Sequence, residues 1–167
     1  MARLNGDYDG MLPQFDWYKD ILPTTQGRVK HYWNHDGCMC VEQPTINGIL
    51  GLAEYGWVDD KLKGTTRYRP ADYEVGVSNN LFIGRLHASQ IEYSWMMLCY
   101  YKFSGIDISE YLPFIEQSVI FYEEHFRMRE KDRTGKELDE NGRLVFYPTN
   151  SLENYQYAKN PTSVMST

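Results

Sequence analysis

Apolar side chains recur at helical spacing in several stretches of the chain. In residues 12–23, three apolar positions at i, i+3 and i+7 share one face: Phe15, Tyr18 and Leu22. Residues 24–33 predict a second helix with Thr24 or Thr25 as its N-cap, and the Asp-Gly turn signal in "NHDGC" ends it. Pro44 suits the first turn of a third helix over residues 44–56, whose apolar face carries Ile46, Ile49, Leu50 and Ala53.

The strongest helical patterns lie in the second half of the chain. Residues 81–103 are apolar nearly all round, so we expect this helix to be buried. Its main apolar stripe contains Leu81, Ala88, Ile91, Trp95 and Leu98, and this stripe is widened by Phe82, Leu86, Tyr93, Met97 and Tyr100. Its narrow polar stripe contains Arg85, Ser89 and Glu92. Residues 112–129 instead have one apolar face (Leu112, Ile115, Val119, Tyr122, Phe126) and one charged face (Glu116, Glu123, Glu124, Arg127). The two patterns together predict an inner helix packed against an outer helix that faces water.

The remaining segments are more polar. Residues 57–79 predict a long loop, and residues 131–148 predict a β-hairpin that turns at Asn141-Gly142. The tail beyond Pro148 is polar and aromatic without a clear period. We therefore predict a single domain over residues 1–167 that is all-α, built from helical hairpins, with one small β-hairpin.

Composition narrows the functional classes. The net charge is −6 and no basic stripe is present, which argues against a nucleic-acid partner. No stretch of about 18 consecutive apolar residues occurs, so no membrane-spanning helix is predicted. Aromatic residues make up 15% of the chain, and Tyr and Trp both fill cores and line sugar-binding clefts.

The segment "HYWNHDGCMCVE", residues 31–42, contains the usual ligands of zinc. Its C-x-C spacing is too tight for a zinc site, and no second Cys/His cluster exists, so we predict no metal and no cofactor. Two interpretations stay open. The histidines and Asp36 hydrogen-bond neighbouring backbone while the cysteines are buried, or the segment lines a cleft with His35, Asp36 and Glu42.

Four stretches carry a resemblance to a known family: "GDYDGMLPQFDWY", "RVKHYWNHDG" with the Glu that follows, "SQIEYSWMMLCYYKFSGID" and "YPTNSLENYQYAKNPT". From Gly6 to about Val164 their order resembles the catalytic region of six-hairpin glycosidases, the (α/α) toroids. The last stretch is similar to the "SPEN" motif of family 95 α-L-fucosidases and their uncharacterised bacterial relatives. Here the motif is "SLEN", so Glu153 and Asn154 match while the proline does not.

The resemblance implies a fold, an activity and a location. The chain would be about half of an (α/α) toroid catalytic domain, a fragment of a periplasmic or secreted parent. The activity would be hydrolysis of an oligosaccharide or polysaccharide by general acid and base, with inversion. Glu153 corresponds to the family's general acid, and the base would lie in the other half of the toroid. A half toroid would expose apolar helix faces, so we expect self-association.

The other candidate residues would contact substrate. Glu42 precedes a predicted helix N-terminus, where a carboxylate is stabilised, and Trp33 offers a stacking face. Glu92 lies among apolar neighbours, either paired with Arg85 or pointing into the central funnel. Asn150 and Asn154 would orient substrate or water, and ordinary turn chemistry is their alternative.

Three functions are thus open. A glycoside hydrolase region with Glu153 as the acid is the leading hypothesis. A carbohydrate-binding module would keep the aromatic side chains and tolerate loss of Glu153. A helical interaction domain would leave the carboxylates on unrelated faces.

Overall fold

The computed structural model describes residues 8–41, 44–48, 87–152 and 155–156, and these residues are mainly helical. A 3₁₀ turn, η1 (Asp9–Met11), leads into α2 (Leu12–Asp20) and then α3 (Leu22–Trp33). After a gap, α4 (Ser89–Ser104), the 3₁₀ turn η2 (Ser109–Tyr111) and α5 (Leu112–Thr134) follow. Two short strands, β1 (Asn150–Leu152) and β2 (Tyr155–Gln156), pair antiparallel.

The two N-terminal helices confirm the predicted pattern. Both begin with a proline in the first turn, where the missing N–H costs no helical hydrogen bond. The predicted cap at Thr24 or Thr25 is wrong, because α3 begins at Leu22 without a side-chain cap. Thr25 is buried, and its hydroxyl donates back to the Leu22 carbonyl at 2.9 Å.

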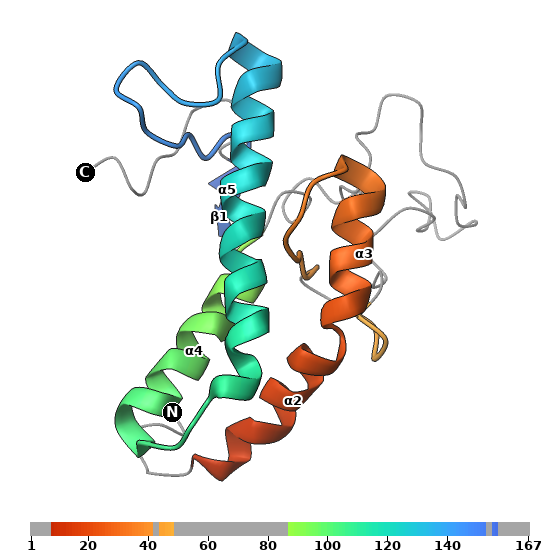
Figure 1. Cartoon of the computed structure of the whole chain (residues 1–167), viewed down its shortest axis with the longest axis vertical. Coiled ribbons are helices and arrows are strands. Elements are labelled where there is room, and N and C mark those ends of the chain that lie inside the picture. The colour runs from red at the N-terminus through yellow and green to blue at the C-terminus, as the bar shows by residue number, and fades with distance from the viewer. Residues whose placement is uncertain (1–7, 42–43, 49–86, 153–154, 157–167) are drawn as a thin grey trace.

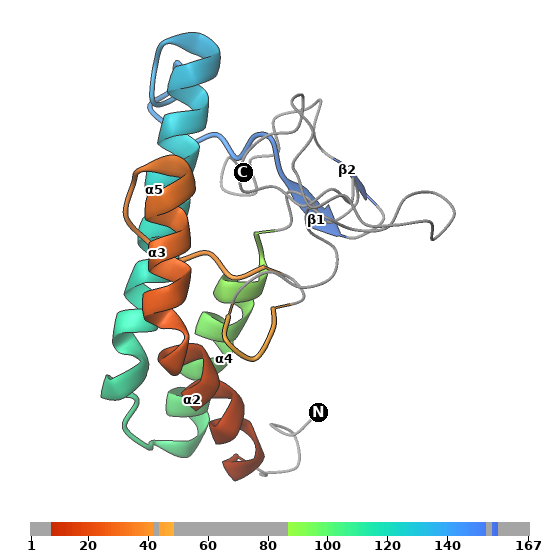
Figure 2. The same cartoon turned by 90° about the vertical axis from the view of Figure 1, so that its right-hand side faces the viewer.

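Helices α4 and α5 pack against each other as predicted, with α5 as the long axis of the molecule (Figure 1). The expectation that α4 is a buried inner helix is wrong, because Trp95 and Tyr101 are more than half exposed. The Tyr122 hydroxyl donates to the His87 carbonyl at 2.6 Å, which ties α5 to the start of α4. In Figure 2, α4 and the strands lie to one side of the layer that α3 and α5 form. The face of that layer that points away from α4 and the strands is formed by α3 and α5.

Aromatic side chains fill much of the core between α2, α4 and α5. Phe15 contacts Tyr100 edge to face, with ring centroids 5.8 Å apart, and Tyr18 packs on Phe114. The larger buried cluster contains Met11, Phe15, Tyr18, Ile21, Cys38, Cys40, Met97, Tyr100, Ile108, Tyr111 and Phe114. The abundance of tyrosine in the sequence is thus used in part to fill the core.

The predicted inward faces of α4 and α5 are confirmed only in part. Met97 and Tyr100 on α4 and Phe126 on α5 are buried as predicted, but other predicted core positions are exposed. On α4 the buried side chains include Gln90, Ser94 and Met97, whereas Trp95 is 61% exposed and Leu98 41% exposed. On α5 the buried stripe is Phe114, Ser118, Phe121 and His125, and Leu112 and Val119 are about half exposed. The reason is that α4 is apolar all round, so its sequence selects no face. The charged face of α5 does face solvent at Glu116 and Glu123, as predicted.

The C-terminal part of the described chain differs from the predicted hairpin. The turn is present, since Asp139 N–H donates to the Arg143 carbonyl at 3.0 Å, but residues 135–149 contain no strand. The described strands, β1 and β2, come later. Of the predicted helix 44–56, residues 44–48 form a turn that ends at Gly48, and the rest lies outside the described residues, as does the predicted loop 57–79.

Candidate functional site

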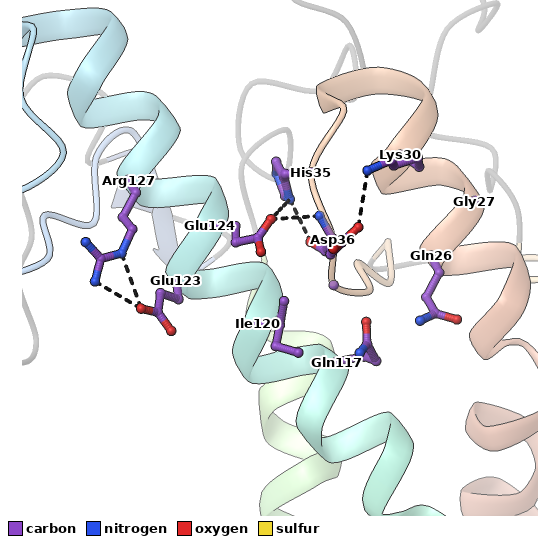
Figure 3. Close-up of a pocket in the computed structure, with 11 residues that line it drawn as sticks. Gln26, Gly27, Lys30, His35, Asp36, Gln117, Ile120, Glu123, Glu124 and Arg127 are labelled. Atoms are coloured by element: carbon purple, nitrogen blue, oxygen red, sulfur yellow. Dashed lines mark hydrogen bonds and ion pairs between the residues drawn. The ribbon is translucent and has the colours of Figure 1, made fainter.

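A polar groove of about 760 Å³ lies between α3 and α5 (Figure 3). Helix α3 contributes Gln26 and Lys30 to its wall, and α5 contributes Gln117, Glu123 and Glu124. The turn that follows α3 places His35 and Asp36 at the groove. Two of the residues that the sequence assigned to substrate binding therefore meet here.

The turn between α3 and residue 38 owes its position to two backbone features. Asn34 adopts a left-handed conformation (φ 58°) and its N–H caps the Lys30 carbonyl, which ends the helix. Gly37 has φ +100° and lies directly on the backbone of Phe121, where a Cβ would collide with the main chain. Cys38 N–H then donates to the Gln117 carbonyl at 2.9 Å. The turn is therefore pressed against α5 at a site that only glycine fits.

Asp36 is held from three directions. Its backbone N–H donates to the Glu124 carboxylate at 2.8 Å, and its carbonyl lies 2.7 Å from Nδ1 of His35. Its carboxylate accepts from the Lys30 ammonium at 3.2 Å. These contacts fix the residue while leaving its carboxylate exposed to solvent, a suitable arrangement for a group that accepts hydrogen bonds from a ligand.

A chain of hydrogen bonds runs from the groove into the interior. His35 Nε2 lies 3.1 Å from His125 Nδ1, and Arg129 Nε lies 3.2 Å from His125 Nε2. Arg129 can only donate and the Asp36 carbonyl can only accept, so the direction of every bond follows. Arg129 donates to His125, His125 donates from Nδ1 to His35, and His35 donates from Nδ1 to Asp36. Both histidines must be neutral for this order to exist.

Burial keeps the two histidines neutral. His125 is fully buried, and this burial, followed by the neighbouring His87 and His35, holds its pKa well below the ordinary value. Burial also lowers the pKa of His35, although the Asp36 carbonyl and the Glu124 carboxylate, 4.0 Å away, act in the opposite direction. The desolvation cost of the imidazolium is the larger effect at both rings.

Trp33, the predicted stacking residue, packs within the protein. Its ring stacks on His35 at a centroid distance of 6.2 Å and meets His125 edge to face at 4.8 Å. It also contacts Phe121, and it does not line the groove. Trp33 thus packs against both histidines inside the protein.

Glu92 is not brought to the groove. It lies exposed on α4, close enough to Tyr18 that its charge adds to the effects of burial and of Tyr93 and Cys40 in raising the pKa of Tyr18. Its alternative partner, Arg85, lies outside the described residues, as do Glu42, Glu153 and Asn154. Asn150 belongs to β1, but its side chain is not among those that the structure describes.

Cys38 and Cys40 are both fully buried, and burial raises the pKa of the Cys38 thiol to about 11. Within the described ranges, no three His, Cys, Asp or Glu side chains are grouped so that they could hold a metal ion. The buried cysteines and the hydrogen bond from His35 to the Asp36 carbonyl agree with the first interpretation of this segment, while His35 and Asp36 also line a groove, as the second expected. None of the described helices has the length and apolarity to cross a membrane.

Two groove residues, Gln117 and Glu124, and the buried His125 were not among the sequence candidates. Their signal was present: His125 continues the buried spacing of Phe114, Ser118 and Phe121 on α5. It was missed because another face of the same helix was taken as the core side.

Searches of family models, curated proteins and solved structures found no match to this chain.

Proposed function

We propose that this chain is a region of a glycoside hydrolase, part of an (α/α) toroid, that binds an oligosaccharide or polysaccharide in the groove between α3 and α5. The observation that carries the proposal is the fixed position of Asp36 in a polar groove beside His35. Sugar hydroxyls both donate and accept hydrogen bonds. The groove offers carboxylate acceptors in Asp36 and Glu124, and both kinds of group in the amides of Gln26 and Gln117.

Hydrolysis would depend on Glu153. In this proposal Glu153 donates a proton to the glycosidic oxygen, and a base from the other half of the toroid activates water on the opposite face of the sugar. Asp36 would accept a substrate hydroxyl rather than a proton from the reaction. Glu42, Asn150 and Asn154 remain proposed substrate contacts, and Glu92 would contact sugar at a separate position, beside Tyr18.

The groove supports the carbohydrate-binding module equally well, because binding needs no catalytic pair.

A specific observation favours the third hypothesis, the helical interaction domain. Trp95, Leu98 and Tyr101 form an exposed apolar stripe along α4, with Trp95 61% and Tyr101 54% exposed. Exposed apolar faces of this kind are common at protein interfaces. Self-association through this stripe is our proposal for its use.

Binding is tested by isothermal titration with a panel of neutral and acidic oligosaccharides. Asp36→Asn keeps the shape of the side chain and removes the charge, so we expect affinity to fall about 10-fold, as for loss of one charge-assisted hydrogen bond. Glu140→Gln, which changes an exposed carboxylate on the 139–142 turn that does not line the groove, is the matched control and should bind like the wild type. Equal affinity of all three proteins would remove Asp36 from the proposed site.

Catalysis needs a separate test. Hydrolysis of the bound oligosaccharide is measured for the wild type and for Glu153→Gln in the parent protein. Loss of turnover with unchanged affinity supports the enzyme. Binding without turnover in the wild type supports the binding module. Absence of binding, combined with a concentration-dependent mass that Trp95→Lys abolishes, supports the interaction domain.

A further inference from the structure

The strongest unexplained feature of the described residues is the buried pair of histidines under the groove. His35 and His125 come from segments 90 residues apart, and together with Trp33 and Phe121 they form a packed aromatic group. A well-packed core needs no imidazole at these positions, since Phe126 and Phe121 fill neighbouring sites on the same helix. The hydrogen bonds make the pair sensitive to protonation, a property that phenyl rings would lack.

Every nitrogen of the two rings is committed to one role. His35 Nδ1 and His125 Nδ1 donate, whereas His35 Nε2 and His125 Nε2 accept. An added proton must therefore go to an accepting nitrogen. On His35 it would face the Nδ1–H of His125 at 3.1 Å, and on His125 it would face the Nε–H of Arg129 at 3.2 Å. In either case a hydrogen bond is replaced by two opposed donors.

We propose that His35 and His125 form a pH-sensitive switch, in which protonation of either ring detaches the turn 34–37 from α5 and reshapes the groove. The turn is the part that moves, because His35 belongs to it and His125 belongs to the long helix. Separation of the rings would also break the contacts that Asp36 N–H makes with Glu124 and that Cys38 N–H makes with the Gln117 carbonyl.

Charged and titratable groups face the two histidines from α3, the turn and α5. Lys30 and Asp36 face His35 from α3 and the turn, and Glu124 faces it from α5. Arg129 on α5 and His87, whose ring centroid lies 5.3 Å away, face His125. Glu124 and Asp36 favour a charged His35, whereas Lys30, Arg129 and His87 disfavour charge on the pair.

The sign of the pH dependence follows from burial. The folded-state pKa of each histidine is lowered, so the unfolded or released chain binds protons more readily. Stability is fully present above the ordinary histidine pKa of about 6.5 and falls as the pH decreases below it. Each histidine that binds its proton only after release increases the unfolding equilibrium constant about 10-fold per pH unit.

The first experiment measures urea unfolding between about pH 7 and pH 5. Wild type should show a steeper increase in the unfolding equilibrium constant than the double variant, with an upper limit of about 100-fold per pH unit beyond that background in the acidic part of this range. His35→Gln and His125→Asn, neutral residues that keep one hydrogen-bonding group in place, should each reduce this limit to about 10-fold. The double variant, which retains His87, supplies that background. His31→Gln, which changes an exposed histidine on α3, is the control and should behave like the wild type.

Two NMR measurements separate the switch from simple acid unfolding. Long-range ¹H–¹⁵N spectra at alkaline pH should show both rings as the Nδ1–H tautomer, and an Nε2–H tautomer on either ring would overturn the proposal. On acidification, the Cys38 amide should lose exchange protection before the amides in the middle of α5. Simultaneous loss, or equal pH slopes for wild type, His35→Gln and His125→Asn, would also overturn it.

The switch does not rest on the proposed function. If the groove binds carbohydrate, affinity should fall with pH in wild type and less so in His35→Gln. The stability and tautomer measurements need no carbohydrate, so failure of the carbohydrate proposal and failure of the switch are seen in different experiments.

Discussion

Replacement of Gly37 by alanine tests whether the groove depends on the contact between the turn and α5. A left-handed conformation costs a non-glycine residue about 1–2 kcal/mol. The new Cβ would also meet the backbone of Phe121, which cannot move without bending α5. Relief of that collision requires the turn to withdraw, with loss of the Cys38–Gln117 and Asp36–Glu124 hydrogen bonds, about 1 kcal/mol or more each. We therefore expect Gly37→Ala to reduce the free energy of unfolding by about 3–5 kcal/mol.

Two other glycines serve as matched controls in the same urea unfolding assay. Gly105 also has positive φ (+70°) but nothing within 4 Å, so Gly105→Ala should cost only the conformational part, about 1 kcal/mol. Gly27 lies within α3 with open space around it, so Gly27→Ala should stabilise the protein by about 0.5–1 kcal/mol. If Gly37→Ala costs no more than Gly105→Ala, the turn is not pressed against α5 as described.

Two further predictions concern buried groups. Arg133 holds the nearly buried Glu130 carboxylate with two close contacts of 2.6 and 2.7 Å. Arg133→Ala should therefore reduce the free energy of unfolding by about 2–3 kcal/mol, measured by thermal unfolding. Arg127→Ala, which breaks an exposed pair with Glu123, should reduce it by less than about 1 kcal/mol. Equal losses would show that burial of Glu130 does not matter. The three cysteines are buried and should react with an aromatic disulfide reagent only after denaturation, and rapid labelling of Cys38 in the native protein would contradict the core described here.

Local sequence signals predicted the helices because their causes are local. Pro13 begins α2 as predicted, whereas Pro23, which was expected to close the first helix, lies in the first turn of α3. Gly105 and Gly135 end α4 and α5 in left-handed conformations, and the two helices extend one and five residues beyond the predicted ends at 103 and 129. The break after Trp33 was also predictable, since Asn34 and Gly37 are residues that accept positive φ. Such preferences depend on a few neighbouring residues and need no knowledge of the fold.

The candidate site was predicted in part. His35 and Asp36 were chosen for their position in a polar turn, and the structure brings them to one groove. The sequence missed Glu124 and His125 because their roles depend on a segment 88 to 90 residues away. The Asp139 turn was likewise local and predicted, whereas its flanking strands were not formed.

By itself, the sequence determined which stretches form helices and that the chain turns after Trp33, and it placed glycine at the one position of the turn that tolerates no side chain. Only the tertiary structure decided which faces of α4 and α5 are buried, because a helix with apolar residues on every side has no preferred orientation until its neighbours are in place. The same is true of the histidine pair. An imidazole becomes buried, neutral and fixed in one tautomer through partners distant in the chain, and no local pattern specifies those partners.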